Sequence, residues 1–230
     1  MVNIAKLKVT PIAETGSRLL PDLMRLDDWS AEGEDVMEFA GRSCYQSFHK
    51  PNPATRANKD YLAHIIESGH GSVLEHAQAT FYIEGVSRAL THELIRHRHL
   101  SYSQMSQRFV DESSLSIVVP PAFEGDPEAV EILKKQADKA VKKYNALVMR
   151  LESQGYKRKA AREAARAVLP NMTETKIVVT GNCRAWRDFL YKRLDPSADM
   201  EIQRLSRELL VFLYTIYPAV FEDLAKKEGV

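Results

Sequence analysis

The chain has 230 residues, and its 32 basic and 31 acidic side chains give a formal net charge of +1 at pH 7. This near balance argues against a dedicated nucleic-acid binder, which usually carries a basic excess, and the length fits a single domain, residues 1–230. Two cysteines, Cys44 and Cys183, are too few for a disulfide framework or a thiolate zinc site, so we expect no metal centre.

The ends of the chain favour a soluble, cytoplasmic protein with no membrane partner. The first ten residues, MVNIAKLKVT, lack the apolar core of a signal peptide. The longest apolar run, residues 209–221, is too short to span a bilayer and is interrupted by Pro218.

In the first half of the chain, hydrophobic periodicity predicts alternating strands and helices. The expected elements are a strand near 7–13, helices over 34–46 and 57–68, a strand over 77–85 and a helix over 86–98. Gly69 is expected to end the second helix, and Gly85 to end the strand before the third. The segments 101–109 and 115–120 read as extended, and residues 120–129 as a loop.

The second half is predicted to be mostly helical. Asp126 followed by Pro127 is a helix-start signal, and long helices are expected from there to about residue 169. Residues 176–182 read as a strand, with Asn182 as the cap of the next helix. The expected fold class is α+β, with a mostly antiparallel sheet and long helices. Because the chain has no G-x-G-x-x-G loop, a bound dinucleotide would have to be held in another way.

The expected helix over 86–98 contains VSRALTHELIRH, residues 86–97, and carries two polar features. Glu93 and His97 are four residues apart and fall within an apolar stripe, so they form either a structural pair or part of a site. HELIRH also approaches the zinc-protease pattern H-E-x-x-H. The second histidine comes one residue too late to share a helix face with the first, so we reject that interpretation.

The stretch RHRHLSYSQMSQR, residues 96–108, contains three arginines and no acidic residue. If its second part is a strand, Tyr102, Gln104, Ser106 and Arg108 share one face. That face is either solvent-exposed or a binding site for phosphate or a nucleotide, which arginine and hydroxyl donors suit. Ser106 lacks the G-x-S-x-G context of a nucleophile.

Three further features have both a structural and a functional reading. Ser72 and Glu75 form the S-x-x-E pattern of a capping box, beside a turn that could bind an anion. Arg158, Arg162 and Arg166 line one helical stripe, as a solvated face or an anion site. Arg193 lies on the apolar face of its helix, and either extends its charge to solvent or points into an active site.

These segments together resemble the flavin-dependent thymidylate synthases. The family's signature is R-H-R, seven residues and a serine, which here is Arg96-His97-Arg98, HLSYSQM and Ser106. Family segments also appear in family order as CYQS, GHGSVLEH, SRALTHELIRHRHLSYSQMSQRFV, ARAVLPN and GNCRAW. The resemblance extends from about residue 35 to 215.

The resemblance implies reductive methylation of dUMP to dTMP, with methylene-tetrahydrofolate as carbon donor and FAD reduced by NADPH as hydride source. It implies the thymidylate synthase-complementing fold, assembled as a homotetramer whose active sites are shared between subunits. It also implies no nucleic-acid partner. The alternatives that stay open are a non-catalytic nucleotide-binding protein and, less well supported by the charge balance, an RNA-binding module.

Residue roles carry over from the resemblance by position. Arg193 matches the catalytic arginine that polarises the uracil ring, and Tyr45 resembles a tyrosine near the folate. The flavin-binding positions are Ser72, Arg96, His97, Arg98, Asn182, Cys183 and Arg184, with His70 and Glu75 in the same family segment as Ser72. The dUMP-binding positions are Glu93, Leu94, Ile95, Arg96, Gln104, Met105, Ser106, Gln107, Arg108, Arg193 and Arg166, the last reaching in from a neighbouring subunit.

The chain departs from the family pattern at two places. Asp188 stands where the family often has a histidine or asparagine that touches the flavin, and the segment DPSADM, which contains Ser197, lacks a common histidine. An aspartate near an electron-rich flavin is unfavourable unless it is paired, and Arg184 is four residues earlier. We therefore assign no flavin role to Asp188 or Ser197.

Overall fold

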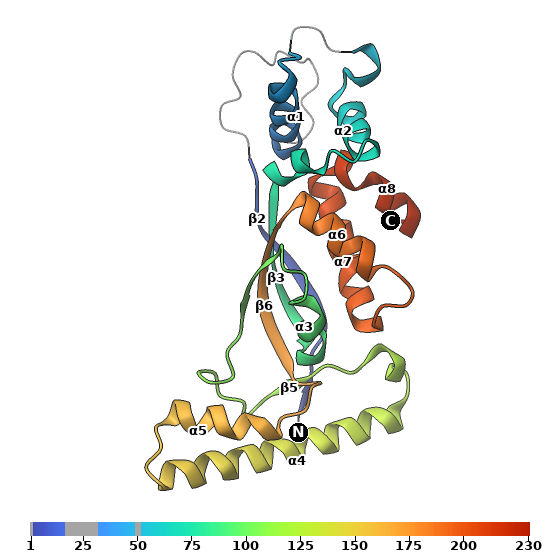
Figure 1. Ribbon diagram of the computed structural model, residues 1–230. Helices are drawn as coiled ribbons and strands as arrows, with labels where there is room; N and C mark the ends of the chain where they lie inside the picture. The colour runs from blue at the N-terminus through green and yellow to red at the C-terminus, as the bar shows by residue number, and fades with distance from the viewer. Residues whose placement is uncertain (1, 17–31, 49–51) are drawn as a thin grey trace.

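A four-stranded antiparallel sheet forms the centre of the molecule in a computed structural model that describes residues 2–16, 32–48 and 52–230 (Figure 1). Its strand order is β2–β3–β6–β4. The strands are β2 (Lys8–Glu14), β3 (Gln78–Ser87), β6 (Glu174–Asn182) and β4 (Ser101–Gln104). Two short strands, β1 (Asn3–Ile4) and β5 (Ser116–Ile117), pair in parallel apart from this sheet. The α+β class and the mostly antiparallel pairing are confirmed.

The helices cluster in three places around the sheet (Figure 1). At one end lie α1 (Glu32–Tyr45) and α2 (Asn58–Glu67), and at the other lie α4 (Pro127–Ser153) and α5 (Arg158–Ala165). Beside the sheet lie α3 (Arg88–Leu94), α6 (Cys183–Arg193), α7 (Met200–Ile216) and α8 (Pro218–Glu228). Short 3₁₀ turns occupy Pro53–Thr55, Gly71–His76, Pro121–Phe123 and Arg166–Val168. Among the described helices, none is both long and apolar enough to cross a membrane.

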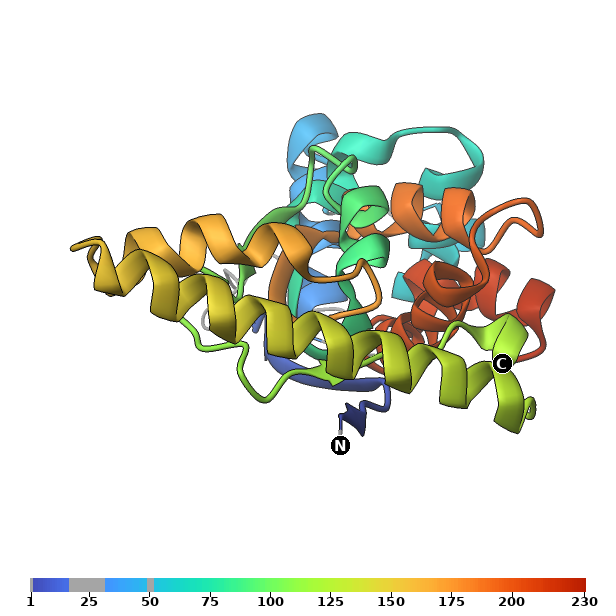
Figure 2. The same ribbon diagram turned by 90° about the horizontal axis from the view of Figure 1, so that it is seen from below.

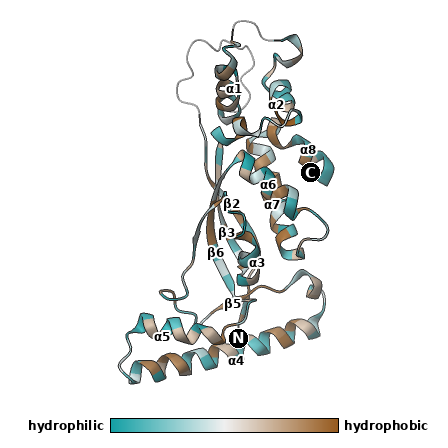
Figure 3. Ribbon diagram, viewed as in Figure 1, coloured by the Kyte–Doolittle hydropathy of each residue, from teal (hydrophilic) through white to brown (hydrophobic). Residues whose placement is uncertain are grey.

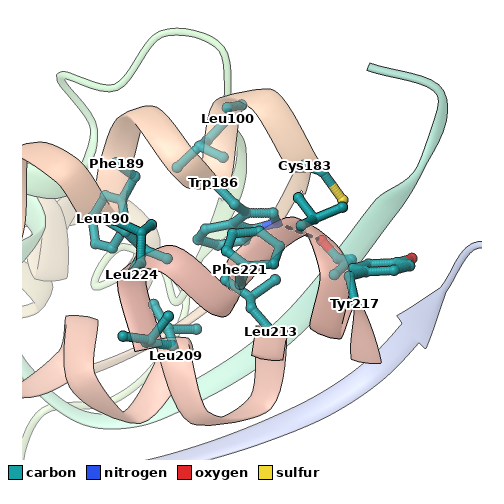
Figure 4. Close-up of a cluster of buried hydrophobic side chains, with 14 of the residues drawn as sticks. Leu100, Cys183, Trp186, Phe189, Leu190, Leu209, Leu213, Tyr217, Phe221 and Leu224 are labelled. Carbon is teal, nitrogen blue, oxygen red and sulfur yellow. Dashed lines mark hydrogen bonds between the residues drawn. The ribbon is translucent and has the colours of Figure 1, made fainter. Parts of the chain in front are cut away.

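The main core lies between the sheet and helices α6, α7 and α8. Strand residues alternate between buried and partly exposed along β6, as a sheet with one covered face requires. Trp186 and Phe189 of α6 are fully buried against this face, and the Trp186 indole donates a hydrogen bond to the carbonyl of Ala79 (3.1 Å). Figure 4 shows these rings among leucines of α7 and α8. The core therefore fixes the inner face of α6, and the opposite edge of this helix lines the candidate active site.

Two buried polar contacts join the beginning of the chain to its end. The Tyr217 hydroxyl accepts from the backbone N–H of Thr15 (3.1 Å) and donates to the carbonyl of Gln78 (2.7 Å). The Glu34 carboxylate accepts from the backbone N–H of Ala219 (2.7 Å), within the first turn of α8. A carboxylate at a helix N-terminus satisfies amides that have no partner inside the helix. Helix α8 is thus fixed to α1 and to the sheet.

Strand β3 continues past Gly85, where the sequence predicted its end. Gly85 has φ of +69°, and the pairing of β3 with β6 shifts between Ile83 and Val86. A Cβ at this position would lie 1.9 Å from the carbonyl oxygen of Lys6. The glycine therefore forms a bulge within the strand, where the backbone of the N-terminal segment approaches closely.

Helix α3 is shorter than the predicted helix over 86–98. Its cap is Ser87, whose hydroxyl accepts from the backbone N–H of Leu90 (3.0 Å). At its end the Tyr102 hydroxyl lies 2.7 Å from the carbonyl oxygen of Leu94 and 2.8 Å from that of His97. In a continuing α-helix the Leu94 carbonyl would accept from the amide four residues later. Here the Tyr102 hydroxyl bonds that carbonyl instead, and the helix ends.

The expected long helices over 127–169 form two helices that project from the sheet (Figure 2). The Asp126 cap is confirmed, since its carboxylate accepts from the N–H groups of Glu128 and Ala129, both at 3.0 Å. The chain turns at Gly155, with φ of +87°, before α5 returns alongside α4. Figure 3 shows hydrophilic and hydrophobic residues mixed along both helices. A small second core of Leu115, Ile117 and Ala137 joins α4 to the segment around β5.

Candidate active site

The junction of β6 and α6 provides one wall of a groove. Asn182 caps α6 as predicted, with its side-chain oxygen accepting from the backbone N–H of Ala185 (2.8 Å). The Cys183 side chain is fully buried, and burial raises the pKa of its thiol. Of the predicted flavin-binding run 182–184, Asn182 and Arg184 line the groove, whereas the Cys183 side chain faces the core. The sequence did not predict the burial of Cys183, because a cysteine suits both a hydrophobic core and a binding site.

Arg184 pairs with Glu75 across the groove, with 2.6 Å between Nη1 and Oε1. Glu75 therefore does not serve in a capping box. The turn Gly71–His76 begins after His70 without any side-chain cap, so the predicted box with Ser72 is wrong. A 3₁₀ turn of six residues has too few turns for the reciprocal capping bonds of an α-helix. Ser72 remains exposed beside Arg184.

Arg193, at the end of α6, is held between Glu93 and His97. Its Nη1 donates to Glu93 Oε2 (2.6 Å), its Nη2 to the Glu93 carbonyl (3.2 Å) and its Nε to His97 Nε2 (2.9 Å). A guanidinium has five N–H groups. Two of them therefore have no acceptor within the part of the chain that the structure describes. The Arg193 side chain is 19% exposed and lines a hollow of about 330 Å³.

His97 lies beneath this hollow rather than in solvent. It is 8% exposed, and its ring packs edge-on against Phe189 with 5.0 Å between ring centres. Burial, with Arg193 as the next contribution, lowers the pKa of His97 to about 4, so the ring is neutral near pH 7. The predicted pairing of Glu93 with His97 is therefore indirect, because Arg193 lies between the two side chains.

Three hollows that share residues form one continuous feature, which we call the arginine groove. The first is lined by Arg96, His97, Arg98, His99, Leu100, Ala185, Asp188, Lys192 and Arg193. The second shares His99, Ala185 and Asp188 with it and adds Glu75, Asn182 and Arg184. The third shares Arg184 and extends past Ser72, His70, Tyr61 and Tyr45.

The first hollow has an excess of positive charge that the chain does not neutralise. Lys192 pairs with Asp188 at 2.8 Å, and Arg193 pairs with Glu93. Arg96 and Arg98 are exposed, and among the described residues neither has an ion-pair or side-chain hydrogen-bond partner. Unpaired arginines in a concave surface suit an anionic ligand, because they remain charged at any physiological pH.

The predicted substrate-binding run 104–108 adopts a different conformation from the one expected. Strand β4 ends at Gln104, whose amide nitrogen lies 3.2 Å from the Thr91 hydroxyl, and a turn follows in which the Phe109 amide bonds the Ser106 carbonyl (3.2 Å). Ser106 and Arg108 are therefore not on a strand face with Tyr102 and Gln104. The polar composition did not distinguish a strand from a turn here.

Arg108 and Arg166 lie near the projecting helices. Arg108 Nε is 2.7 Å from Glu163 of α5, and Arg166 is half-buried at the end of that helix. The other cations of the predicted arginine stripe are paired, Arg162 with Asp111 (2.6 Å) and Arg158 with Glu152 (3.7 Å). Only Arg166 of this stripe lacks an ion-pair partner among the described residues.

The structure thus places the predicted residues in two groups. The amide of Met105 bonds Lys176 near the start of β6 (2.8 Å), whereas Asn182 at the groove is six residues further along that strand. At about 3.3 Å per residue the two groups are roughly 20 Å apart along β6. Gln107 belongs with Met105 to the group near the start of β6, and its buried side-chain nitrogen has no hydrogen-bond partner among the described residues.

One prediction around Asp188 needs correction. Asp188 does not pair with Arg184, which is engaged by Glu75, but with Lys192 at 2.8 Å. Lys192 itself was not predicted as a site residue, although its spacing of four residues from Asp188 was a readable signal. His99 and Tyr61 also line the groove without having been predicted. Within the described ranges, no group of three or more potential metal ligands is present.

An α+β fold with a groove in which Arg96 and Arg98 have no ion-pair partner among the described residues suits small anionic ligands. Residues 25–219 match the family described as "Thymidylate synthase complementing protein". The chain is 52% identical over 233 residues to proteins from Mycobacteroides abscessus and Mycobacterium avium, and over 230 residues to one from Mycobacterium tuberculosis. Each alignment covers 97% of this chain and 92% of the relative, and each relative is named "Flavin-dependent thymidylate synthase". The chain belongs to the thymidylate synthase complementing protein family.

Proposed function

We propose that this chain is a flavin-dependent thymidylate synthase. It catalyses the reductive methylation of dUMP to dTMP, with methylene-tetrahydrofolate as carbon donor and FAD, reduced by NADPH, as cofactor. Family membership and the names of the relatives support the activity. The observation in this chain that carries the proposal is the arginine groove, with Arg193 held at one end and the unpaired cations Arg96 and Arg98 beside it.

The groove suits a flavin dinucleotide on the chemistry of its donors. Arg96, Arg98 and Arg184 supply fixed positive charge for a pyrophosphate or an anionic isoalloxazine ring. Ser72 and Asn182 add neutral polar groups, and His97 supports the floor of the groove. Cys183 contributes through its backbone alone, because its thiol is buried. When bound, the reduced flavin supplies the hydride that completes the methyl group.

Arg193 is the proposed catalytic residue. Its two N–H groups that have no acceptor among the described residues are placed to bond the uracil carbonyls, and its charge stabilises negative charge as it develops on the ring. Glu93 and His97 hold the guanidinium before substrate binds, so little reorganisation is needed at the reacting geometry. Leu94 is fully buried and contributes backbone only, whereas Ile95 is 46% exposed beside Arg96.

The dUMP phosphate is proposed to bind Ser106, Arg108 and Arg166, with the backbone of Met105 and Gln107 shaping the turn. The Met105 end of this group lies roughly 20 Å along β6 from Asn182 within one chain. A nucleotide monophosphate is too short to cover that distance together with the groove. We therefore propose a homotetramer in which one subunit supplies the groove and another the phosphate-binding residues. Tyr45, 75% exposed at the far end of the groove, is proposed to face the folate.

A reconstituted reaction tests this function. Purified protein is incubated anaerobically with dUMP, methylene-tetrahydrofolate, FAD and NADPH, and dTMP is quantified by mass spectrometry against reactions that omit one component each. The proposal expects dTMP only in the complete mixture. Colourless protein that binds dUMP but not FAD would instead identify a non-catalytic nucleotide-binding protein.

A further inference from the structure

Four side chains form a linear array that includes the proposed catalytic residue. Asp188 Oδ2 lies 3.8 Å from His97 Nδ1, and His97 Nε2 lies 2.9 Å from Arg193 Nε. Arg193 in turn donates to Glu93 at 2.6 Å. Asp188 and Arg193 both come from α6, whereas Glu93 comes from the end of α3 and His97 from the turn after it. The histidine therefore lies between two positions of one helix.

The chemistry of Arg193 determines which nitrogen of His97 carries the proton. A guanidinium only donates hydrogen bonds, so His97 Nε2 must present its lone pair to Arg193. A neutral imidazole then has its proton on Nδ1, the nitrogen that faces Asp188. The ring is neutral near pH 7, since burial and Arg193 lower the pKa of His97 to about 4. Only one of the two neutral tautomers is thus compatible with the hydrogen bond to Arg193.

Asp188 is placed to favour that tautomer. Its carboxylate is held by Lys192 at 2.8 Å and is 44% exposed, whereas the His97 side chain is 7% exposed. At 3.8 Å the contact between Asp188 and His97 is electrostatic rather than a direct hydrogen bond. A negative charge on this side of the ring stabilises the N–H dipole that points toward it and opposes the tautomer with a lone pair there. The packing of His97 on Phe189 keeps the ring from turning away.

We propose that Asp188 is a positioning residue that acts on Arg193 through His97. By stabilising the Nδ1–H form of His97, the Asp188 carboxylate preserves the acceptor for Arg193 Nε and so fixes the orientation of the guanidinium toward the uracil. This inference rests on the proposed function for its substrate, but the tautomer of His97 is a property of the protein itself. Asp188 has no direct contact with the reacting atoms in this scheme.

The first test replaces Asp188→Asn in the FAD-loaded enzyme. An asparagine amide can donate to Nδ1 and so permits the tautomer that cannot accept from Arg193. We expect kcat/KM for dUMP, measured at saturating FAD, to fall about tenfold, the effect of losing one hydrogen bond to a charged group. The matched control is Asp195→Asn, an exposed aspartate just beyond α6 whose carboxylate accepts from the Ser197 amide and hydroxyl. Equal kcat/KM in wild type and the Asp188 variant would overturn the proposal.

A second test separates positioning from a direct effect on the flavin. The His97→Leu variant offers Arg193 no acceptor, so it leaves no tautomer or amide orientation for Asp188 to select. In a His97→Leu background, Asp188→Asn should therefore cause no further loss of kcat/KM. A full tenfold loss in that background would show that Asp188 acts by another route.

A third measurement does not depend on turnover. Nitrogen-15 NMR of histidine-labelled protein distinguishes the two tautomers by the shifts of Nδ1 and Nε2, and His97→Gln identifies the signal by its loss. We expect the Nδ1–H form in wild type and a mixture in the Asp188→Asn protein. An Nε2–H form in wild type refutes the positioning role even if dTMP is made, whereas absence of dTMP with an intact Nδ1–H signal refutes only the proposed function.

Discussion

Replacing Arg193→Ala is the most direct perturbation of the proposed chemistry. It removes the three hydrogen bonds to Glu93 and His97 and the two N–H groups that have no acceptor among the described residues. The fold should persist, because α6 is anchored by Trp186 and Phe189, both fully buried. The ion pair with Glu93 is partly exposed, so its loss should cost roughly 1 kcal/mol of stability.

The catalytic loss should be much larger than the loss of stability. Removing one preorganised donor from a site of developing negative charge lowers kcat by about 10²- to 10³-fold. Arg193 offers two such donors together with a full charge, so we expect a decrease near the upper end, about 10³-fold, in single-turnover dTMP formation. FAD binding should largely survive, because Arg96 and Arg98 are unaffected.

Arg187 provides a matched control for the Arg193 variant. It lies on the same helix, its side chain is 18% exposed against 19% for Arg193, and it also pairs with a carboxylate, that of Asp223 (2.7 Å). Arg187→Ala should lower the unfolding midpoint while kcat per folded molecule stays unchanged. A kcat within threefold of wild type for Arg193→Ala would refute the assigned role.

Three further outcomes are expected. Gly85→Ala should destabilise the protein by about 3 kcal/mol or more, because residue 85 has a positive φ and its Cβ would clash with the backbone of Lys6. Gly125→Ala should cost only about 1 kcal/mol, because residue 125 also has a positive φ but its Cβ would meet no atom within 4 Å. Urea unfolding of both variants measures the difference. Arg96→Gln should raise the FAD dissociation constant about tenfold and flatten its salt dependence in a fluorescence titration, while Arg158→Gln, at a surface ion pair, should change neither. The pKa of His97 is about 6.5 in the unfolded chain and about 4 in the folded protein, so between these pH values the unfolded chain binds the extra proton. The free energy of unfolding should therefore decrease by on the order of 3 kcal/mol as pH falls through that window. His97→Gln should show a shallower decrease, and an equal pH dependence of stability in both proteins would contradict the buried, neutral His97.

Local signals were sufficient for most elements of the fold. The cap at Asp126, the cap at Asn182 and the stop at Gly69 depend on residues within one turn, and each lies where the sequence placed it. The limits of α3 depended instead on Tyr102, whose hydroxyl engages the carbonyl of Leu94 from a neighbouring strand. That contact is made only after the strand has paired with the sheet, so periodicity alone did not predict it.

The candidate site was recognised through its arginines but not through their partners. Arg193 and His97 are 96 residues apart in the chain and meet because α6 and the turn after α3 pack on the same edge of the core. Arg184 pairs with Glu75, 109 residues away in the chain. Asp188 therefore pairs with Lys192 and not with Arg184. Helical spacing identified possible ion-pair partners, but tertiary packing determined which pairs form.

The order of the strands has a consequence for how the chain is made. Thr80 of β3 and Thr180 of β6 face each other with their hydroxyl oxygens 3.0 Å apart, although one hundred residues separate them. At ribosomal rates of roughly ten residues per second, β3 waits on the order of ten seconds for its central neighbour. Tyr217, which ties Thr15 to Gln78, follows later still. The apolar face of β3 is therefore uncovered during much of synthesis, and the sheet closes only when the chain is nearly complete.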